Sequence, residues 1–160
     1  MADVVFKSSG TTGAAKTIVR SEASLQADAH DLVSFFRELW GDSPPVVASV
    51  PSDHLYGALW RVRVPAIAGS QVAPNTAISL EDLLDAEAKY GKFIFVTTPS
   101  FLEKLLQHPD VERLSKAFFG IVTSGSLLRR ETALAATKLF GVAPLEIFGC
   151  SEVGTVAYRR

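Results

Sequence analysis

Short apolar runs alternate along the chain with longer segments in which apolar residues recur at helical spacing. Leu25, Ala29 and Phe36 lie on one face of such a segment, and Ser21 is a suitable N-cap residue for it. Residues 93–96 form an apolar run, as expected of a strand buried on both faces. By these criteria we expect strands at residues 4–7, 17–19, 46–50, 71–73, 93–96, 118–122, 145–148 and 153–158. We expect helices at residues 21–40, from about 55 to no further than Pro65, and at 80–90, 101–107 and 130–140.

This order of elements predicts an α/β fold in which a largely parallel sheet carries flanking helices. Strands that alternate with helices of about ten residues are typical of βαβ units. The first two strands differ, because only the glycine-rich segment 8–16 joins them. We therefore expect those two strands to form an antiparallel pair around that loop.

Composition excludes several classes of protein. The 160 residues include 48% hydrophobic and 21% charged side chains, which is ordinary for a globular domain. Sixteen basic residues nearly cancel seventeen acidic ones, so no broad basic field indicates a nucleic-acid partner. One cysteine cannot form an internal disulfide, and no apolar run is long enough to span a membrane. Because the first residues also lack the pattern of a signal peptide, we expect a cytoplasmic protein.

The strongest chemical signal is the loop at residues 8–16, which reads SSGTTGAAK. Its glycines and small residues leave backbone N–H groups accessible, its hydroxyls add donors, and Lys16 adds a cation. Such a loop suits a polyphosphate. It differs from a Walker A loop, because two residues separate Gly13 from Lys16. Taken alone, a glycine-rich loop is more often a solvent-exposed turn.

A second signal, FGCSE at residues 148–152, directly follows a predicted strand. An aromatic ring, a glycine, a hydroxyl and a carboxylate at the carboxyl end of a strand suit a nucleotide and its metal. Taken alone, this turn is unremarkable as well.

Together the two motifs resemble the acyl-adenylate-forming superfamily, which includes acyl-CoA synthetases, aryl-CoA ligases, peptide-synthetase adenylation domains and luciferases. Two further segments between them, DHLYG at 53–57 and TSGSLL at 123–128, are similar to family elements and occur in the family's order. The sequence departs from the family pattern at Ala15, where proline is usual, and at Ser126, where a small apolar residue is usual.

The resemblance implies ATP-dependent activation of a small carboxylic acid to an acyl-AMP. It implies Mg²⁺ as cofactor, and CoA or a phosphopantetheine-bearing acyl carrier protein as acceptor. The residues that it assigns to ATP are Ser8, Ser9, Gly10, Thr11, Thr12, Gly13, Lys16, Phe148, Gly149, Ser151 and Glu152. Those that it assigns to the acid are His54, Gly57, Gly125 and Ser126, and those that it assigns to the metal are Glu152 and Thr11.

No residue is assigned as catalytic, although His54 is the candidate in the acyl site. On sequence alone, His54 is almost as well explained as an exposed residue at the start of a helix. We interpret His30, His108 and Cys150 as residues without a chemical role, because none has a partner pattern. Two tryptophans, Trp40 and Trp60, fall on apolar helix faces and are interpreted as packing residues.

The resemblance also implies that residues 1–160 are a fragment of the family's AMP-binding N-terminal domain. Family members carry, after the glutamate motif, an aspartate that holds the ribose and a small C-terminal lid with a lysine. Here no acidic residue follows Glu152, and Lys138 is the last lysine. We therefore expect the lid to be absent, the fragment alone to be inactive, and its exposed strand edges to favour self-association. A non-catalytic nucleotide-binding or regulatory module with this fold is the alternative.

Overall fold

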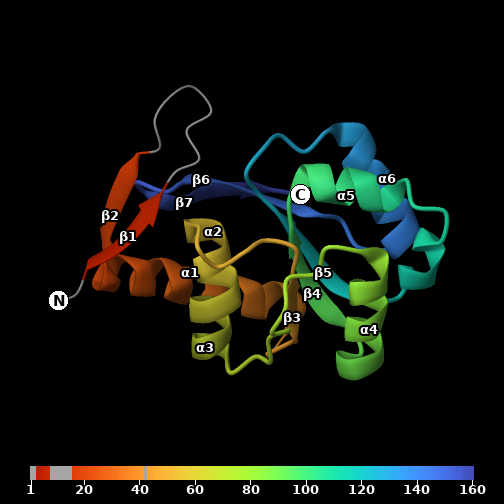
Figure 1. Cartoon of the computed structure of the whole chain (residues 1–160), viewed down its shortest axis with the longest axis horizontal. Coiled ribbons are helices and arrows are strands. Elements are labelled where there is room, and N and C mark those ends of the chain that lie inside the picture. Colours follow the sequence, from red (N-terminus) through yellow and green to blue (C-terminus); the bar gives the residue numbers. More distant parts are fainter. Residues whose placement is uncertain (1–2, 8–15, 42) are drawn as a thin grey trace.

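The strands form two separate sheets (Figure 1). The computed structural model describes residues 3–7, 16–41 and 43–160. The larger sheet has the order β3-β4-β5-β6-β7, and β1 pairs with β2 alone. The strands are β1 (Asp3–Lys7), β2 (Thr17–Ser21), β3 (Val46–Ala48), β4 (Phe93–Thr97), β5 (Phe118–Thr123), β6 (Leu145–Cys150) and β7 (Gly154–Arg159). The helices are α1 (Glu22–Trp40), α2 (Leu55–Ala58), η1 (Leu59–Arg63), α3 (Val64–Ala68), α4 (Leu80–Tyr90), α5 (Pro99–Leu106), η2 (Val111–Leu114) and α6 (Arg130–Phe140).

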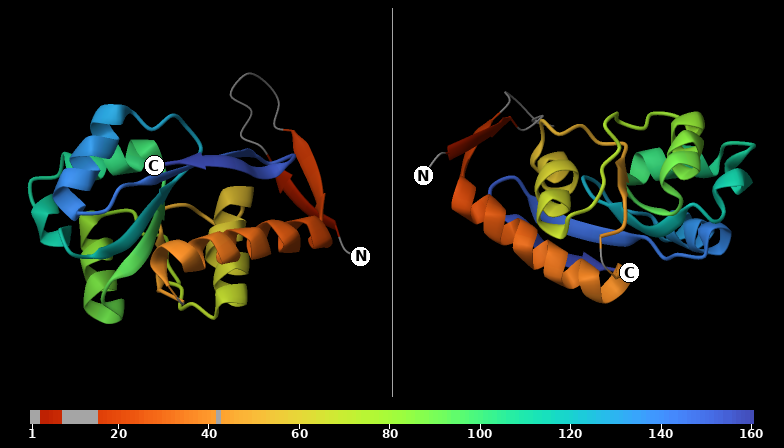
Figure 2. Two further views of the ribbon diagram at one scale, coloured as in Figure 1. Left: turned by 180° about the vertical axis from the view of Figure 1, so that it is seen from behind. Right: turned by 90° about the horizontal axis from the view of Figure 1, so that it is seen from below.

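The larger sheet is parallel from β3 to β6, and β7 returns antiparallel to β6. Its central strands are buried on both faces because alternate side chains enter two different cores. On β4, Ile94 and Val96 pack with α1 and the α2–α3 segment, whereas Phe93 and Phe95 pack with α4, α5 and α6. Figures 1 and 2 show the first group of helices on one side of β3–β5 and the second group on the other. The α/β class with a largely parallel sheet is therefore confirmed.

The predicted antiparallel pair is also confirmed, because β1 and β2 align from Asp3 opposite Ser21 to Lys7 opposite Thr17. Along β2, Ile18 and Arg20 are buried while their neighbours are exposed. Helix α1 begins directly after β2, where the Ser21 side chain accepts a hydrogen bond from the backbone N–H of Ser24. The loop that joins the two strands, residues 8–15, lies outside the described residues.

The helix that was expected to end by Pro65 continues to Ala68, so that prediction was wrong. The reason is a π-helical turn, η1, in which the N–H of Val64 bonds the carbonyl of Leu59 five residues earlier. Proline cannot donate the next bond of an α-helical ladder. Because the turn has already interrupted that ladder, Pro65 fits at the start of α3. Gly69, in the left-handed conformation at φ 71°, ends the helix.

Other boundaries also differ from the prediction, among them α5, which begins at Pro99, and β6, which extends to Cys150. Residues 71–73 form a single parallel bridge between Val72 and Val46 rather than a strand. Strand β3 ends at Ala48, two residues early, because the chain turns there toward α2. The sequence analysis also missed the short 3-10 helix η2. Within the described ranges, no helix is both long and apolar enough to cross a bilayer.

Candidate functional site

A cavity of about 440 Å³ opens where the parallel strands end, on the face of the sheet that carries α2. Each of the strands β3 to β7 contributes residues from its end or from the loop beside it. They are Val50, Pro51, His54, Leu55, Tyr56, Gly57, Leu59, Thr98, Ser124, Gly125, Ile147, Gly149, Cys150, Ser151, Gly154 and Thr155. Ligands of open α/β sheets bind at this edge, because loops from several strands converge there. The structure therefore brings five predicted site residues into one cavity: His54, Gly57, Gly125, Gly149 and Ser151.

One wall of the cavity is the start of α2. His54 is the N-cap residue of this helix, and its side chain is 52% exposed, with Nε2 3.8 Å from Oδ1 of Asp53. Both interpretations of His54 thus describe the same position, at a helix start and facing the cavity. Gly57 permits a close approach, since a Cβ there would lie 1.7 Å from the carbonyl oxygen of Pro51.

Tyr56 ties this wall to the sheet. Its hydroxyl lies 3.1 Å from the carbonyl oxygen of Thr97 and 3.0 Å from that of Val122, at the ends of β4 and β5. Burial of the hydroxyl raises the pKa of Tyr56 well above its usual value of 10.0, against the hydrogen bond to Thr97, which lowers it. Tyr56 therefore stays neutral and fixes α2 over the two central strands.

The turn after β5 is held by a buried carboxylate. Glu146, only 1% exposed, accepts a hydrogen bond of 2.7 Å from the backbone N–H of Leu128 and one of 2.5 Å from Nε of Arg159. Arg159 in turn donates to the carbonyl of Leu128, and Ser124 donates to the carbonyl of Ile147. These bonds fix Gly125, whose φ of 94° favours glycine, at the rim of the cavity.

The turn between β6 and β7 carries the acidic motif. A shift in the strand register follows Phe148, and a Cβ on Gly149 would lie 2.3 Å from the carbonyl oxygen of Gly154. Only glycine allows the two strands to approach this closely. Cys150 ends β6 opposite Gly154, and Ser151 and Glu152 follow in the turn itself.

Glu152 lies near the end of the glycine-rich loop. Hydrogen bonds from its own backbone N–H and from the Cys150 thiol, together with the positive charge of Lys16, hold the pKa of Glu152 below its usual value. The carboxylate is exposed and therefore charged at neutral pH. Lys16 and Glu152, which are 136 positions apart in sequence, are thus close enough in space to interact electrostatically.

The remaining predicted site residues lie elsewhere. Phe148 is 39% exposed and does not line the cavity, and its ring lies 5.6 Å from the guanidinium carbon of Arg159. Ser126 is exposed and lies outside the cavity lining. The predicted phosphate-binding residues Ser8, Ser9, Gly10, Thr11, Thr12 and Gly13 fall outside the described residues, and with them the predicted metal ligand Thr11.

Three residues next to the site were missed by the sequence analysis: Tyr56, Glu146 and Arg20. Tyr56 lay inside a motif but was not given a role. Glu146 and Arg20 each have a visible signal, because each is a charged residue at an inward-facing position of an apolar strand. Such a residue needs a partner, and the partners are distant in sequence.

The donor set near Glu152 fits a magnesium ion that is held mainly by phosphate. In the part of the chain that the structure describes, no three His, Cys, Asp or Glu side chains gather to hold a metal. Mg²⁺ is usually bound by one or two carboxylates together with water and substrate phosphates. A single charged, exposed carboxylate next to Ser151, which lines the cavity, agrees with that mode.

Comparisons with known proteins identify the family. A model described as AMP-binding enzyme matches residues 4–160, and the chain belongs to this family. It is 29% identical over 156 residues to a 4-coumarate--CoA ligase of Cereibacter sphaeroides, covering 97% of this chain and 36% of that protein. It is 25% identical over 155 residues to an indoleacetate--CoA ligase of Aromatoleum aromaticum, covering 96% and 30%.

The fold is that of solved adenylate-forming ligases. ATP-bound MatB from Rhodopseudomonas palustris superposes with a TM-score of 0.83 at 24% identity, over 97% of this chain and 30% of MatB. The chain thus spans about a third of the length of the curated relatives it matches.

Proposed function

We propose that this chain supplies the ATP- and acid-binding part of an AMP-forming acid–thiol ligase. In that reaction a substrate carboxylate attacks the α-phosphorus of ATP, pyrophosphate leaves, and an acyl-AMP forms. The acyl group then passes to the thiol of CoA or of a phosphopantetheine carrier protein. Membership of the AMP-binding family and similarity to CoA ligases support this proposal.

The observation that carries the proposal is the convergence of the motifs on one cavity. The His54 wall, the Gly125 turn and the Gly149–Ser151 segment line it, and Glu152, the residue after Ser151, lies close enough to Lys16 to interact electrostatically. Both reactants are anionic, so the site must neutralise charge and hold them in line. Lys16 offers a cation to the phosphates, and Glu152 offers a carboxylate to Mg²⁺.

Each group has a defined task in this proposal. Bound Mg²⁺ would neutralise phosphate charge and orient the pyrophosphate leaving group. Ser151 would donate a hydrogen bond to the α-phosphate, and the face of Phe148 would lie against adenine. The six residues Ser8 to Gly13 would donate to the β- and γ-phosphates, with Thr11 as a second metal ligand.

The lining of the cavity favours an acid with an apolar or aromatic acyl group. Val50, Leu55, Leu59 and Ile147 line it, and the ring of Tyr56 lies among them. The relatives are named for 4-coumarate and indoleacetate, which are both aromatic acids. His54 would face the carboxylate, and Gly57, Gly125 and Ser126 would bound the acyl site.

The test is calorimetric titration of the 160-residue chain with ATP, in Mg²⁺ and in EDTA, with the wild type and Glu152→Ala. We expect weak binding that Mg²⁺ strengthens in the wild type, because the ion joins the phosphates to Glu152. In Glu152→Ala the two conditions should give the same affinity.

His108→Ala is the control, since this partly exposed side chain bonds locally, accepting from the N–H of Asp110 at 3.2 Å. Its Mg²⁺ dependence should match that of the wild type. Two results would refute the assigned role of Glu152. One is wild-type ATP binding with the same affinity in Mg²⁺ and in EDTA, and the other is an unchanged Mg²⁺ dependence in Glu152→Ala.

A further inference from the structure

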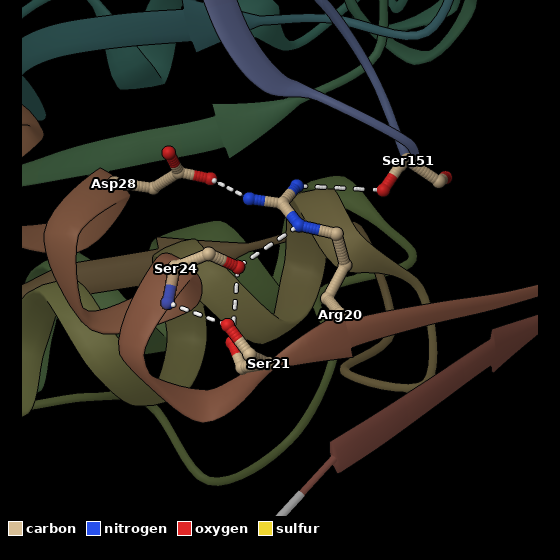
Figure 3. A network of polar contacts seen from close by, with 5 residues as sticks. All are labelled: Arg20, Ser21, Ser24, Asp28 and Ser151. Carbon is tan, nitrogen blue, oxygen red and sulfur yellow. Dashed lines mark hydrogen bonds and ion pairs between the residues drawn. The ribbon is translucent and has the colours of Figure 1, made fainter. Parts of the chain in front are cut away.

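Arg20 is a buried cation that joins the first strand pair to the turn of the acidic motif. It occupies an inward-facing position of β2 and is 7% exposed (Figure 3). A buried guanidinium is costly unless its donors are used. Its contacts therefore show what it holds in place.

The three nitrogens of the guanidinium have three different partners. Nε donates to Oγ of Ser24 at 3.1 Å, and Nη2 donates to Oδ2 of Asp28 at 2.9 Å, both on α1. Nη1 donates to the backbone carbonyl of Ser151 at 3.4 Å, across 131 positions of sequence. In Figure 3 the guanidinium lies between the α1 residues and the β6–β7 turn.

Asp28 packs closely against the other end of the same turn. Gly154 has a φ of 84°, and a Cβ at this position would lie 2.1 Å from Oδ2 of Asp28. The Arg20–Asp28 pair therefore contacts the turn at both ends, at Ser151 and at Gly154. Between these two residues lies Glu152.

Lys16 directly precedes this strand. It lies four residues before Arg20, about 13 Å along an extended chain. Arg20 thus fixes the Glu152 turn to the strand that begins next to the lysine of the glycine-rich loop. This connection is rigid, because the backbone of β2 is paired with β1 throughout.

We propose that Arg20 is a positioning residue that sets the distance between Lys16 and the Glu152 turn by holding the Ser151 carbonyl to β2 and α1. The proposal rests on the function proposed above. Arg20 touches neither ATP nor the acid; it acts through Ser151 and Glu152. Loss of its contact with Ser151 should therefore reduce the gain in ATP affinity that Mg²⁺ brings. The effect on the stability of the chain should be smaller.

Arg20→Lys separates this role from that of the ion pair. A lysine at this position keeps a positive charge beside Asp28, but one ammonium cannot reproduce the planar fork that reaches Ser24, Asp28 and Ser151 together. Arg63→Ala is the matched control. It removes another arginine–carboxylate pair between two elements, that of Arg63 in η1 with Glu22 in α1. This pair lies away from the β6–β7 turn.

The position of the turn can be measured without ATP through the single cysteine of the chain, Cys150, which is exposed. The Cys150 thiol donates a hydrogen bond to Glu152 while the turn is in place, so the reactivity of the thiol reports the geometry of the turn. In Arg20→Lys the rate of reaction with a small aromatic disulfide at constant pH should rise about fivefold. Arg63→Ala should react at the wild-type rate.

ATP titrations of the same variants complete the experiment. Arg20→Lys should bind ATP in EDTA like the wild type, while the gain from Mg²⁺ falls about fivefold, within the usual range for coupled sites. A wild-type thiol rate together with a full gain from Mg²⁺ in Arg20→Lys would overturn the positioning role. Equal losses in Arg20→Lys and Arg63→Ala would also overturn it, since they would reveal only lost stability. Failure of the wild type to bind Mg-ATP would instead refute the proposed function, and with it any role for Arg20 in nucleotide binding, even if the thiol rate changes.

Discussion

At the scale of single residues, Tyr56 and Gly57 support the same cavity wall in different ways. Tyr56 contributes a hydroxyl within hydrogen-bond distance of two strands, and Gly57 contributes the absence of a side chain against Pro51. Neither role requires contact with a ligand. The short segment between His54 and Gly57 is therefore a structural support as well as a part of the cavity lining.

Tyr56→Phe should lower stability and change its dependence on alkaline pH. Loss of the hydroxyl removes a buried hydrogen bond, which costs about 1 kcal/mol. The folded-state pKa of Tyr56 lies above 10.0 and the unfolded value near it, so ionisation favours unfolding above that pH. The stability that the neutral Tyr56 hydroxyl contributes is therefore fully present below pH 10, and it should be lost as the pH rises further.

Urea denaturation at pH 8 and at pH 10.5 checks this prediction. The difference in stability between the wild type and Tyr56→Phe should be smaller at the higher pH. An unchanged difference would show that the buried hydroxyl does not resist ionisation.

At the scale of elements, the loops of the site are held by bonds between distant segments. The Glu146–Arg159 pair fixes the turn after β5 to strands β6 and β7. Arg20 fixes the β6–β7 turn to β2 and α1. The rim of the cavity therefore depends on buried charges as much as on apolar packing.

Arg159→Met should destabilise the chain by about 2–3 kcal/mol, because it leaves the buried Glu146 carboxylate without its cation. Arg129→Met is the matched control, since Arg129 and Glu103 are both exposed and lie 3.8 Å apart. That change should cost less than about 1 kcal/mol. Chemical denaturation of both variants measures the difference, and similar values for the two would contradict the role of Glu146.

The extent to which the fold could be predicted varies from one element to the next. Helices α4 and α6 begin and end as predicted, because glycine and apolar periodicity are local signals. The continuation of the helix past Pro65 could not be predicted in this way, since it depends on a π-helical turn that the packing of Trp60 and Val64 stabilises.

The site shows the same contrast between local and distant signals. Its motifs are contiguous and were found, whereas the contact between Arg20 and Ser151 spans the whole chain.

At the scale of the whole molecule, both sheets end in strands that are paired on one side within the described residues. Strand β7 is the last strand of the larger sheet, and β1 pairs only with β2 in that part of the chain. Several apolar side chains near the edge of β7 are exposed, namely Val153, Val156 and Tyr158. Exposed edge strands of this kind promote pairing between molecules.

The chain should therefore form dimers or larger species at high concentration, as measured by light scattering. Val156→Lys should reduce this association, because a charged residue on an edge strand opposes pairing. Ile78→Lys is the control, as Ile78 is 77% exposed but lies outside the strands. A wild type that stays monomeric, or equal effects of the two changes, would contradict edge pairing.

The π-helical turn at Leu59–Arg63 contains one residue more than a regular helix would need at that place. Deleting one residue there would restore an uninterrupted α-helix and leave α2 on the same side, because the extra residue of a π turn is absorbed within that turn. The consequence falls on Pro65 instead, whose ring would then lie inside a continuous helix and clash with the carbonyl four residues earlier. The π turn thus allows a proline close to the cavity wall without changing the direction that His54, Tyr56 and Gly57 face. Among related chains, loss of the extra residue should therefore accompany replacement of the proline.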